Sequence, residues 1–291
     1  MKKLVSSVLV LCMIAVALAG CGNKSTETTK ATEATASTES AVSTEAVSET
    51  QAAEVEAATI QVYIAASLSN AMDEISANYK SVQPNVDLVF NAGSSGKLQT
   101  QIEEGGACDV FFSAATKQMN ALVEGGYVQE ADVTDLLENK VQLIKPAGTE
   151  TKVTGFENIT DAANLALAAD TVPVGQYARE IFDNLGITDQ VMAMEINECE
   201  DVSAVLAAVS EGSNEVGIVY ATDAASVADK VDVIATANDT ELKSKVIYPV
   251  GLVKNTEADD AEVAAAKAFV DYLKTREAAA VFEKYGFSCI N

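Results

Sequence analysis

The 291-residue chain carries a formal charge of −24 at pH 7 and contains no histidine and no tryptophan. This acidity argues against nucleic acid and against a basic membrane-binding patch. It does not exclude a small anionic ligand, because charges farther away than about 8 Å are largely screened at physiological salt. The lack of histidine removes the usual general base, the Ser-His-Asp and Cys-His systems and most catalytic zinc sites.

The N-terminus has the pattern of an export signal. Two lysines precede an apolar run over residues 4–18, which is shorter than the roughly 20 residues of a membrane span. The run ends in Leu18-Ala19-Gly20-Cys21, which resembles a bacterial lipobox. We therefore predict a signal peptide over 1–20 and a lipid on Cys21, which would hold the protein outside the cytoplasm at the cell surface or the periplasmic face. An ordinary cleaved signal or an uncut anchor is the alternative.

Residues 21–57 are predicted to be the lipidated cysteine followed by a disordered linker. From residue 23 on, this segment is almost entirely Ser, Thr, Ala, Glu and Lys, without aromatic residues, glycine or proline. Such a composition cannot bury enough apolar surface to offset the entropy of ordering. A fraying alanine-rich helix would serve the same purpose as a spacer.

Three cysteines remain in the expected folded part, Cys108, Cys199 and Cys289. They are far apart in sequence and lack metal-ligand spacing, so we interpret them as small buried residues. One disulfide among them stays open at this point.

Short β-rich runs alternate with segments of helical periodicity from residue 58 onward, which predicts an α/β fold with mixed, mainly parallel sheets flanked by helices. The expected strands are 59–64, 86–90, 109–113, 141–144, 165–168, 216–220, 231–235 and 246–253. Helices are expected to begin near residues 67, 94, 175 and 201, to include residues 119–123 and to cover 261–273 and 277–285. Since these units are too many for one small sheet, we predict two lobes. Lobe 1 would comprise 58–141 and 249–291, and lobe 2 would comprise 142–248.

Four turns share one design, in which a strand ends, small or polar residues follow, and a helix begins. They are 65–68, 93–96, 173–176 and 200–203. The first turn of a helix presents unpaired N–H groups and a partial positive charge, and small residues let an anion approach them. Taken alone, each turn is an ordinary helix cap or loop. Together, two from each lobe would enclose a small anion.

Two other interpretations of these turns fail. A phosphate-binding loop around Gly96-Lys97 would need glycine at 91 and Ser or Thr at 98, where the chain has Asn91 and Leu98. The segment also lacks the Gly-x-Ser-x-Gly pattern of a hydrolase nucleophile. We interpret Asp201 as a charge at a helix start.

Seven segments in a characteristic order make the chain similar to the molybdate-binding proteins of bacterial molybdate ABC transporters, from Val62 to Ser288. The segments are residues 65–72 (AASLSNAM), 93–98 (GSSGKL), 108–114 (CDVFFSA), 172–178 (VPVGQYA), 217–220 (GIVY), 248–250 (YPV) and 282–287 (FEKYGF). The resemblance implies a two-lobed periplasmic-binding-protein fold that closes around molybdate or tungstate. It places the oxyanion contacts on Ser67, Ser95, Val174, Val202 and Tyr220.

The resemblance also implies how each residue would contribute. Ser67 and Ser95 would donate through hydroxyl and backbone N–H groups, Val174 and Val202 through backbone N–H only, and Tyr220 through its hydroxyl. Molybdenum would be bound only as molybdate, with no other metal and no cofactor. A fully deprotonated dianion offers only acceptors, so a site made of donors without a carboxylate suits it. Selection against sulfate would then depend on size.

These features predict an extracytoplasmic solute-binding lipoprotein, a monomer without enzymatic activity, that delivers molybdate and tungstate to an ABC permease. A binding protein for another small oxyanion or anionic metabolite is the alternative within the same fold. A hydrolase using Ser67 or Ser95 and a purely structural lipoprotein are less consistent with the sequence, because no histidine is available and because the donor turns would lack a purpose.

Overall fold

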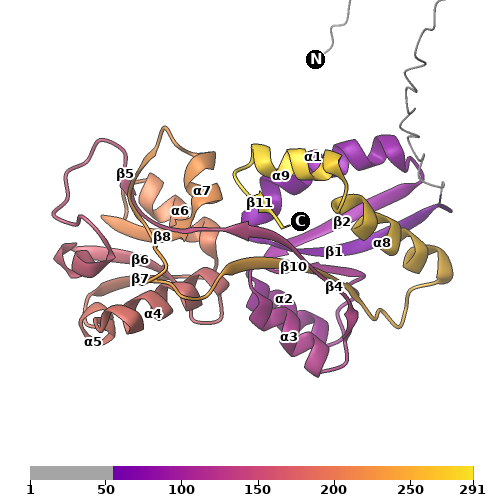
Figure 1. The fold of residues 1–291 in the computed structure, drawn as a ribbon, viewed down its shortest axis with the longest axis horizontal. Coiled ribbons are helices and arrows are strands. Elements are labelled where there is room, and N and C mark those ends of the chain that lie inside the picture. The colour runs from indigo at the N-terminus through magenta and orange to yellow at the C-terminus, as the bar shows by residue number, and fades with distance from the viewer. Residues whose placement is uncertain (1–54, 291) are drawn as a thin grey trace, which may run out of the picture. The chain divides into compact units, whose positions relative to one another are not determined.

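The structure is a computed structural model that describes residues 55–290. The predicted signal peptide 1–20, Cys21 and nearly all of the linker 21–57 lie outside these residues. The described part has two mixed sheets flanked by helices (Figure 1), so the predicted α/β fold with two sheets is confirmed. We call the first sheet with its helices lobe 1 and the second sheet with its helices lobe 2.

Lobe 1 contains a six-stranded sheet in the order β11-β4-β10-β3-β1-β2. Its strands are β1 (Ala58–Ala65), β2 (Val86–Gly93), β3 (Val110–Phe112), β4 (Val128–Asn139), β10 (Val246–Val253) and β11 (Ser288–Cys289). Its helices are α1 (Ser69–Val82), α2 (Ser95–Glu103), α3 (Thr116–Glu124), α8 (Asp260–Leu273) and α9 (Arg276–Lys284), preceded by a 3₁₀ helix over Ala66–Leu68. The C-terminal helices pack in this lobe, α8 against β1 and α9 against α1.

Lobe 2 contains a five-stranded sheet in the order β7-β6-β8-β5-β9. Its strands are β5 (Val141–Pro146), β6 (Asn164–Ala168), β7 (Glu195–Cys199), β8 (Val216–Tyr220) and β9 (Val231–Thr236). Its helices are α4 (Pro173–Leu185), α5 (Thr188–Met192), α6 (Val202–Ser210) and α7 (Ala221–Ser226), with a 3₁₀ segment over Phe156–Asp161.

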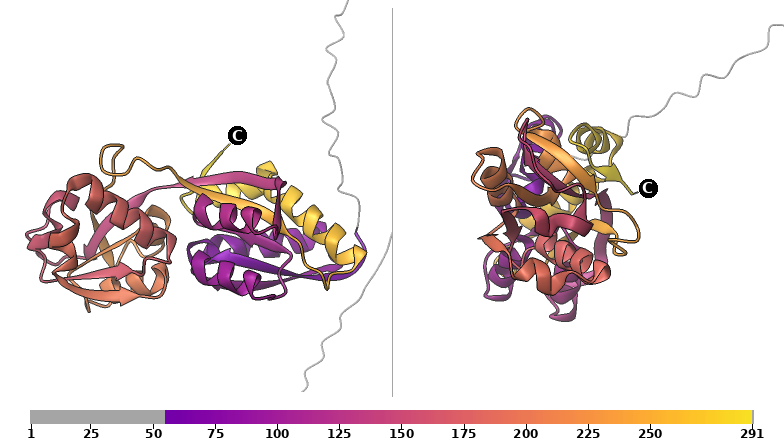
Figure 2. Two further views of the ribbon diagram at one scale, coloured as in Figure 1. Left: turned by 90° about the horizontal axis from the view of Figure 1, so that it is seen from below. Right: turned by 90° about the vertical axis from the view of Figure 1, so that its left-hand side faces the viewer.

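Both sheets are mixed, as predicted, although parallel pairing does not dominate them. In the described residues β1 pairs in parallel with β2 and β3, and β6 with β7 and β8, whereas every pairing of β4, β5, β9, β10 and β11 is antiparallel. The antiparallel strands include those that cross between the lobes, β4 leading into β5 and β9 leading back to β10. Figure 2 shows these crossings, in which β4 and β10 run side by side.

The central strands of lobe 1 are continuous apolar runs because both of their faces are buried. Phe111 and Phe112 are adjacent in β3, point to opposite faces of the sheet and are both fully buried, because helices cover both faces. Tyr79 of α1 has its ring centroid 5.0 Å from those of Phe269 and Tyr272 in α8. These aromatic contacts fix the returning C-terminal segment against the N-terminal half of the lobe.

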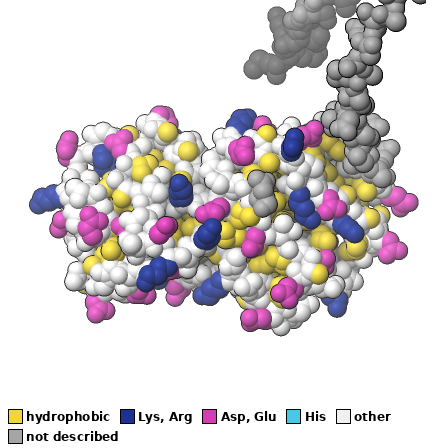
Figure 3. Space-filling model, viewed as in Figure 1, with side chains coloured by type: hydrophobic (Ala, Val, Ile, Leu, Met, Phe, Trp, Pro, Cys, Tyr) yellow, Lys and Arg dark blue, Asp and Glu magenta, His cyan; other side chains and the backbone are white. Residues whose placement is uncertain are grey.

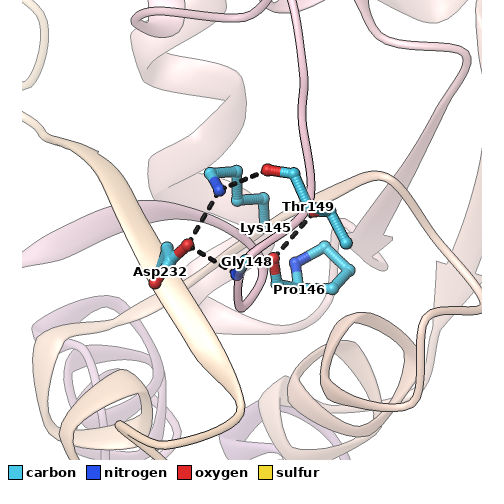
Figure 4. A network of polar contacts seen from close by, with 5 residues as sticks. All are labelled: Lys145, Pro146, Gly148, Thr149 and Asp232. Carbon is cyan, nitrogen blue, oxygen red and sulfur yellow. Dashed lines mark hydrogen bonds and ion pairs between the residues drawn. The ribbon is translucent and has the colours of Figure 1, made fainter.

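A polar network ties the turn after β5 to the neighbouring strand β9 (Figure 4). The Lys145 ammonium lies 2.8 Å from Asp232 Oδ2 and donates to the carbonyl of Thr149. The backbone N–H of Gly148 donates to the same carboxylate oxygen at 3.0 Å. The Lys145 bond, together with that from Gly148, holds the pKa of Asp232 below its usual value. The network stabilises this turn and includes none of the predicted site residues.

The three cysteines of the described part are free thiols. Cys108 and Cys199 are buried, as predicted, while Cys289 is half-buried, and the alternative of a disulfide among them is not formed in this structure. Burial raises the pKa of the Cys199 thiol. Within residues 55–290 no helix has the length and apolar character needed to cross a membrane, and no cluster of three acidic or cysteine side chains could hold a metal ion.

Candidate functional site

One small cavity is lined by residues of both lobes and includes all five residues predicted from the sequence. They are Ser67, Ser95, Val174, Val202 and Tyr220. The cavity volume is about 10 Å³, room for roughly one water-sized sphere. In this arrangement of the lobes the cavity admits only a very small ligand.

Sheet geometry brings Ser67 and Ser95 together. β1 and β2 are parallel neighbours, and their last residues, Ala65 and Gly93, are paired in register. The chain leaves both strands at the same edge, so the 3₁₀ helix that contains Ser67 and the helix that begins at Ser95 start side by side. Ligands of open α/β sheets bind at this edge, beyond the carboxyl ends of the strands.

Ser95 is fully buried at the first position of α2. The helix cap is the preceding residue, Ser94, whose Oγ accepts the N–H of Lys97. The Oγ of Ser95 instead accepts the backbone N–H of Ala114 at 3.0 Å. The Ser95 hydroxyl therefore retains its proton for a further partner, and the first N–H groups of α2 have no acceptor within the helix.

Lobe 2 contributes two helix N-termini. Val174 is the second residue of α4, after Pro173, and Val202 is the first residue of α6. Both valine side chains are apolar and buried, so any polar contact from them must come from the backbone N–H. The carboxylate of Asp201 accepts the N–H of Ala204 at 2.9 Å, which confirms its interpretation as a helix-start charge.

Tyr220 ends β8, and its hydroxyl is buried without a hydrogen-bond partner among the described residues. The rings of Tyr177 and Tyr248 lie against it at centroid distances of 6.5 and 5.6 Å. Burial, and then the neighbouring Tyr248, raise the pKa of Tyr220 well above its usual value. The phenol therefore keeps its proton and can act as a donor.

The cavity has an unusual electrostatic composition for an anion site. None of its lining residues is lysine or arginine, and the one charged residue, Asp201, is engaged in capping α6. On the face of the molecule drawn in Figure 3, basic side chains lie singly among acidic ones and form no basic patch. Positive potential in the cavity must therefore come from the N-termini of α2, α4 and α6.

Several contacts link the lobes around the cavity. Lys97 of α2 forms an ion pair with Glu200, and Gln118 of α3 donates to Gln176 of α4 at 3.3 Å. The backbone of Gly96 also approaches that of Thr171 very closely. The lobes thus hold the cavity closed in this structure.

Two further residues near the cavity were not predicted as functional. Tyr248 of β10 forms a hydrogen bond with Ser67, and Asn139 at the end of β4 donates to Tyr248. Tyr248 was part of a family-like segment, but neither residue lies in a turn of the donor type. Nothing in their local sequence indicates these contacts, because they depend on how strands far apart in the chain are arranged in the sheet.

Two lobes that close on a shared cavity, each contributing helix N-termini, define the class of periplasmic-binding-protein folds. Residues 60–288 match the family described as bacterial extracellular solute-binding protein, and the chain belongs to this family.

Two relatives of known sequence cover most of the chain. The chain is 37% identical over 231 residues, 79% of this chain and 86% of the relative, to YvgL of Bacillus subtilis, named as a candidate ABC transporter substrate-binding lipoprotein. It is 36% identical over 237 residues, 79% of this chain and 88% of the relative, to the molybdate-binding protein ModA of Escherichia coli.

A solved structure shows the same fold. It is the substrate-binding domain of a candidate molybdenum ABC transporter from Clostridium difficile, at 34% identity and a TM-score of 0.60, covering 80% of this chain and 99% of that one. The resemblance noted in the sequence is confirmed by these similarities.

Proposed function

We propose that the protein captures molybdate, and also tungstate, outside the cytoplasm and delivers it to an ABC permease. The observation that carries this proposal is that Ser67, Ser95, Val174, Val202 and Tyr220 line one cavity whose lining includes no lysine or arginine. The similarity to ModA supports the same ligand.

The donor set suits an oxyanion without protons. The hydroxyls of Ser67, Ser95 and Tyr220 and the N–H groups of Val174 and Val202 can all donate, and the nearby carboxylate of Asp201 is already bonded to Ala204. Hydrogen bonds to a charged group contribute about 1.5–3 kcal/mol each. Five to seven such hydrogen bonds can therefore offset the hydration free energy that a small dianion loses when it enters the site.

Lobe closure would couple binding to transport. Serines come from lobe 1, while the valines and Tyr220 come from lobe 2, so only the closed state offers every donor to one ligand. A ligand that contacts both lobes favours closure by its differential affinity for that state. The permease would then recognise the closed form, and the protein itself would perform no chemistry.

The N-terminal segment would supply the anchor. We propose cleavage after residue 20, lipid on Cys21 and a linker to residue 57, which would tether a monomeric binding domain at the membrane. The name of the Bacillus relative, a lipoprotein, supports this part of the proposal. The lobe boundaries at 141/142 and 248/249 belong to the same proposal; they lie within β5 and β10, close to the crossings between the sheets.

Another small oxyanion is the second candidate, because a ring of neutral donors also suits sulfate. An organic anionic metabolite fits less well, since the cavity is small and the lobes would have to separate farther for a carbon skeleton than for a five-atom oxyanion. Sulfate has the charge and shape of molybdate but shorter bonds, so discrimination between them requires that the donors cannot converge further.

Isothermal titration calorimetry with the soluble domain tests the proposal. Molybdate and tungstate should bind tightly, and sulfate and phosphate at least about 100-fold more weakly, a difference of about 2.7 kcal/mol. A flat titration with molybdate, or sulfate binding of equal strength, would contradict the assignment.

A further inference from the structure

Four side chains form a continuous chain of hydrogen bonds from the cavity to the opposite lobe. Ser67 Oγ lies 3.0 Å from the Tyr248 hydroxyl. The Asn139 amide nitrogen donates to that hydroxyl at 3.2 Å and to Thr222 Oγ1, in α7, at 2.9 Å. Asn139, Thr222 and Tyr248 are all buried.

The direction of these bonds is fixed at Asn139. Its side-chain oxygen lies 2.8 Å from the backbone nitrogen of Lys140, and a backbone N–H can only donate. The oxygen of the amide must therefore face Lys140, which turns the NH₂ group toward Thr222 and Tyr248. Both amide protons are then used as donors.

Because Asn139 donates to Tyr248, the direction of the next hydrogen bond, between Tyr248 and Ser67, is also determined. The Tyr248 oxygen accepts from Asn139, so its one proton can go to Ser67 Oγ, which lies 3.0 Å away. A buried hydroxyl proton without an acceptor would be costly. Burial, and next the charge of Asp223, raise the pKa of Tyr248 well above its usual value, so the phenol keeps this proton. Ser67 Oγ thus accepts from Tyr248 and turns its own proton elsewhere.

We propose that Tyr248 and Asn139 are positioning residues that hold Ser67 as a hydrogen-bond donor toward the cavity and so make the site selective for fully deprotonated oxyanions. This inference rests on the proposed function and deepens it. An oxyanion that keeps a proton, such as hydrogen phosphate, needs one hydrogen-bond acceptor in the site. Ser67 cannot be that acceptor, because Tyr248 holds it as a donor toward the ligand.

Ser95 shows the same polarity by another route. Its Oγ accepts the N–H of Ala114, a group that cannot reverse its role. With Tyr220 free to donate, each of the three hydroxyls in the cavity offers a proton and none is obliged to accept one from the ligand. The two hydrogen bonds from Asn139 to Tyr248 and from Tyr248 to Ser67, which we call the relay, differ because both are made by side chains. A substitution can therefore reverse their direction.

Asn139→Asp is the substitution that reverses the relay. The new carboxylate keeps the bond from Lys140 but accepts from Tyr248, whose oxygen then accepts the Ser67 proton. Affinities for molybdate and phosphate are compared above neutral pH, where phosphate carries the same double charge as molybdate but keeps one proton. Because both ligands then feel the added charge alike, their affinity ratio reports the polarity of Ser67. We expect this ratio to fall at least about tenfold.

Tyr248→Phe provides a second test that adds no charge. It should weaken molybdate binding about tenfold in the wild-type background and have no further effect in a Ser67→Ala background, since the relay acts only through Ser67. Tyr79→Phe is the matched control, because it removes another buried phenol of lobe 1, one that has no hydrogen-bond partner in the described part of the chain. It should leave binding unchanged, and melting temperatures identify any variant that fails to fold.

The outcomes separate the two proposals. Absence of molybdate binding by the wild-type protein would overturn the proposed function and the relay together. Normal binding that Ser67→Ala weakens, combined with an unchanged molybdate-to-phosphate ratio in Asn139→Asp or with additive effects of Tyr248→Phe and Ser67→Ala, would overturn the relay alone.

Discussion

A Cβ atom at Gly96 would lie 2.1 Å from the carbonyl oxygen of Thr171, far inside any real contact between such atoms. Gly96 is in α2 of lobe 1, and Thr171 precedes α4 in lobe 2. The absence of a side chain at this position is therefore a condition for the lobes to meet as they do. The lack of a side chain at Gly96 is thus linked to the closed state on which binding depends.

Gly96→Ala should fold but bind weakly. The added methyl group meets backbone rather than a flexible side chain, so the lobes must stay farther apart and the donors of one lobe lose the ligand. We expect molybdate affinity to fall by about 100-fold or more, about 2.7 kcal/mol, with a small change in melting temperature without ligand. The control is Gly148→Ala, which is outside the cavity lining and where a new Cβ would have no atom within 4 Å. Equal affinities of the two variants would show that Gly96 does not limit closure.

Side-chain and main-chain donors should respond differently to substitution by alanine. Ser95→Ala removes a hydroxyl donor and leaves the N–H of Ala114 unpaired in a buried place, which costs about 1–3 kcal/mol of stability. Its molybdate affinity should fall as well. Val174→Ala shortens a buried side chain but keeps the N–H, so its melting temperature should fall while its affinity persists. Calorimetry and thermal denaturation of both variants check this, and strong loss of binding in Val174→Ala would contradict a main-chain role.

Asp223 predicts a dependence of stability on pH. Burial raises its pKa to about 7 from the ordinary 3.8, an effect to which the charge of Asp201 adds and which the bond from the Tyr220 N–H opposes. The folded protein therefore binds this proton more tightly than the unfolded chain, so the free energy of unfolding falls as pH rises from about 4 to about 7.

Asp223→Asn should remove this loss. The melting temperature of the variant should exceed that of the wild-type protein by more at pH 8 than at pH 5, as thermal scans at both pH values would show. Asp229→Asn, at an exposed aspartate near the end of α7, should show no such difference. A gain that is equal at both pH values would mean that the Asp223 carboxyl does not titrate in this range.

The lipid anchor gives a prediction about location. Cys21→Ala removes the sulfur that would carry the lipid, so the protein should no longer partition into detergent or label with a radioactive fatty acid. Molybdate binding should stay unchanged, because the anchor lies outside the binding domain. Equal labelling of the variant and the wild-type protein would exclude lipidation at Cys21.

Much of the fold could be predicted because most of its elements carry a local signal. The strand at Val216–Tyr220 is a buried apolar run, and α4 begins with a proline at its first position, as helices often do. β7 was missed because it is an edge strand with exposed Glu195, Asn197 and Glu198, and edge strands tolerate polar residues on both faces. β4 was missed because much of its first half is polar and exposed, so it lacks the apolar pattern of a buried strand.

The site was predictable only in part. Ser67, Ser95, Val174, Val202 and Tyr220 follow strands or begin helices, so local patterns, with the resemblance to a family, could indicate them. Asn139 and Tyr248 lie in no such turn, since Asn139 meets Tyr248 only through the antiparallel pairing of β4 with β10. Their separation along the chain exceeds 100 residues, and no periodicity spans that distance.

The pairing of β4 with β10 also determines when the molecule can be completed. Lobe 2 is a continuous stretch of chain inserted between these two strands, whereas the sheet of lobe 1 needs β10 and β11 from the C-terminal end. During synthesis or export lobe 2 can therefore assemble as soon as it emerges, while lobe 1 must wait for the last residues of the chain. Because the two strands of lobe 1 must close a loop as long as lobe 2, early folding of the insert would shorten that loop and speed the final step.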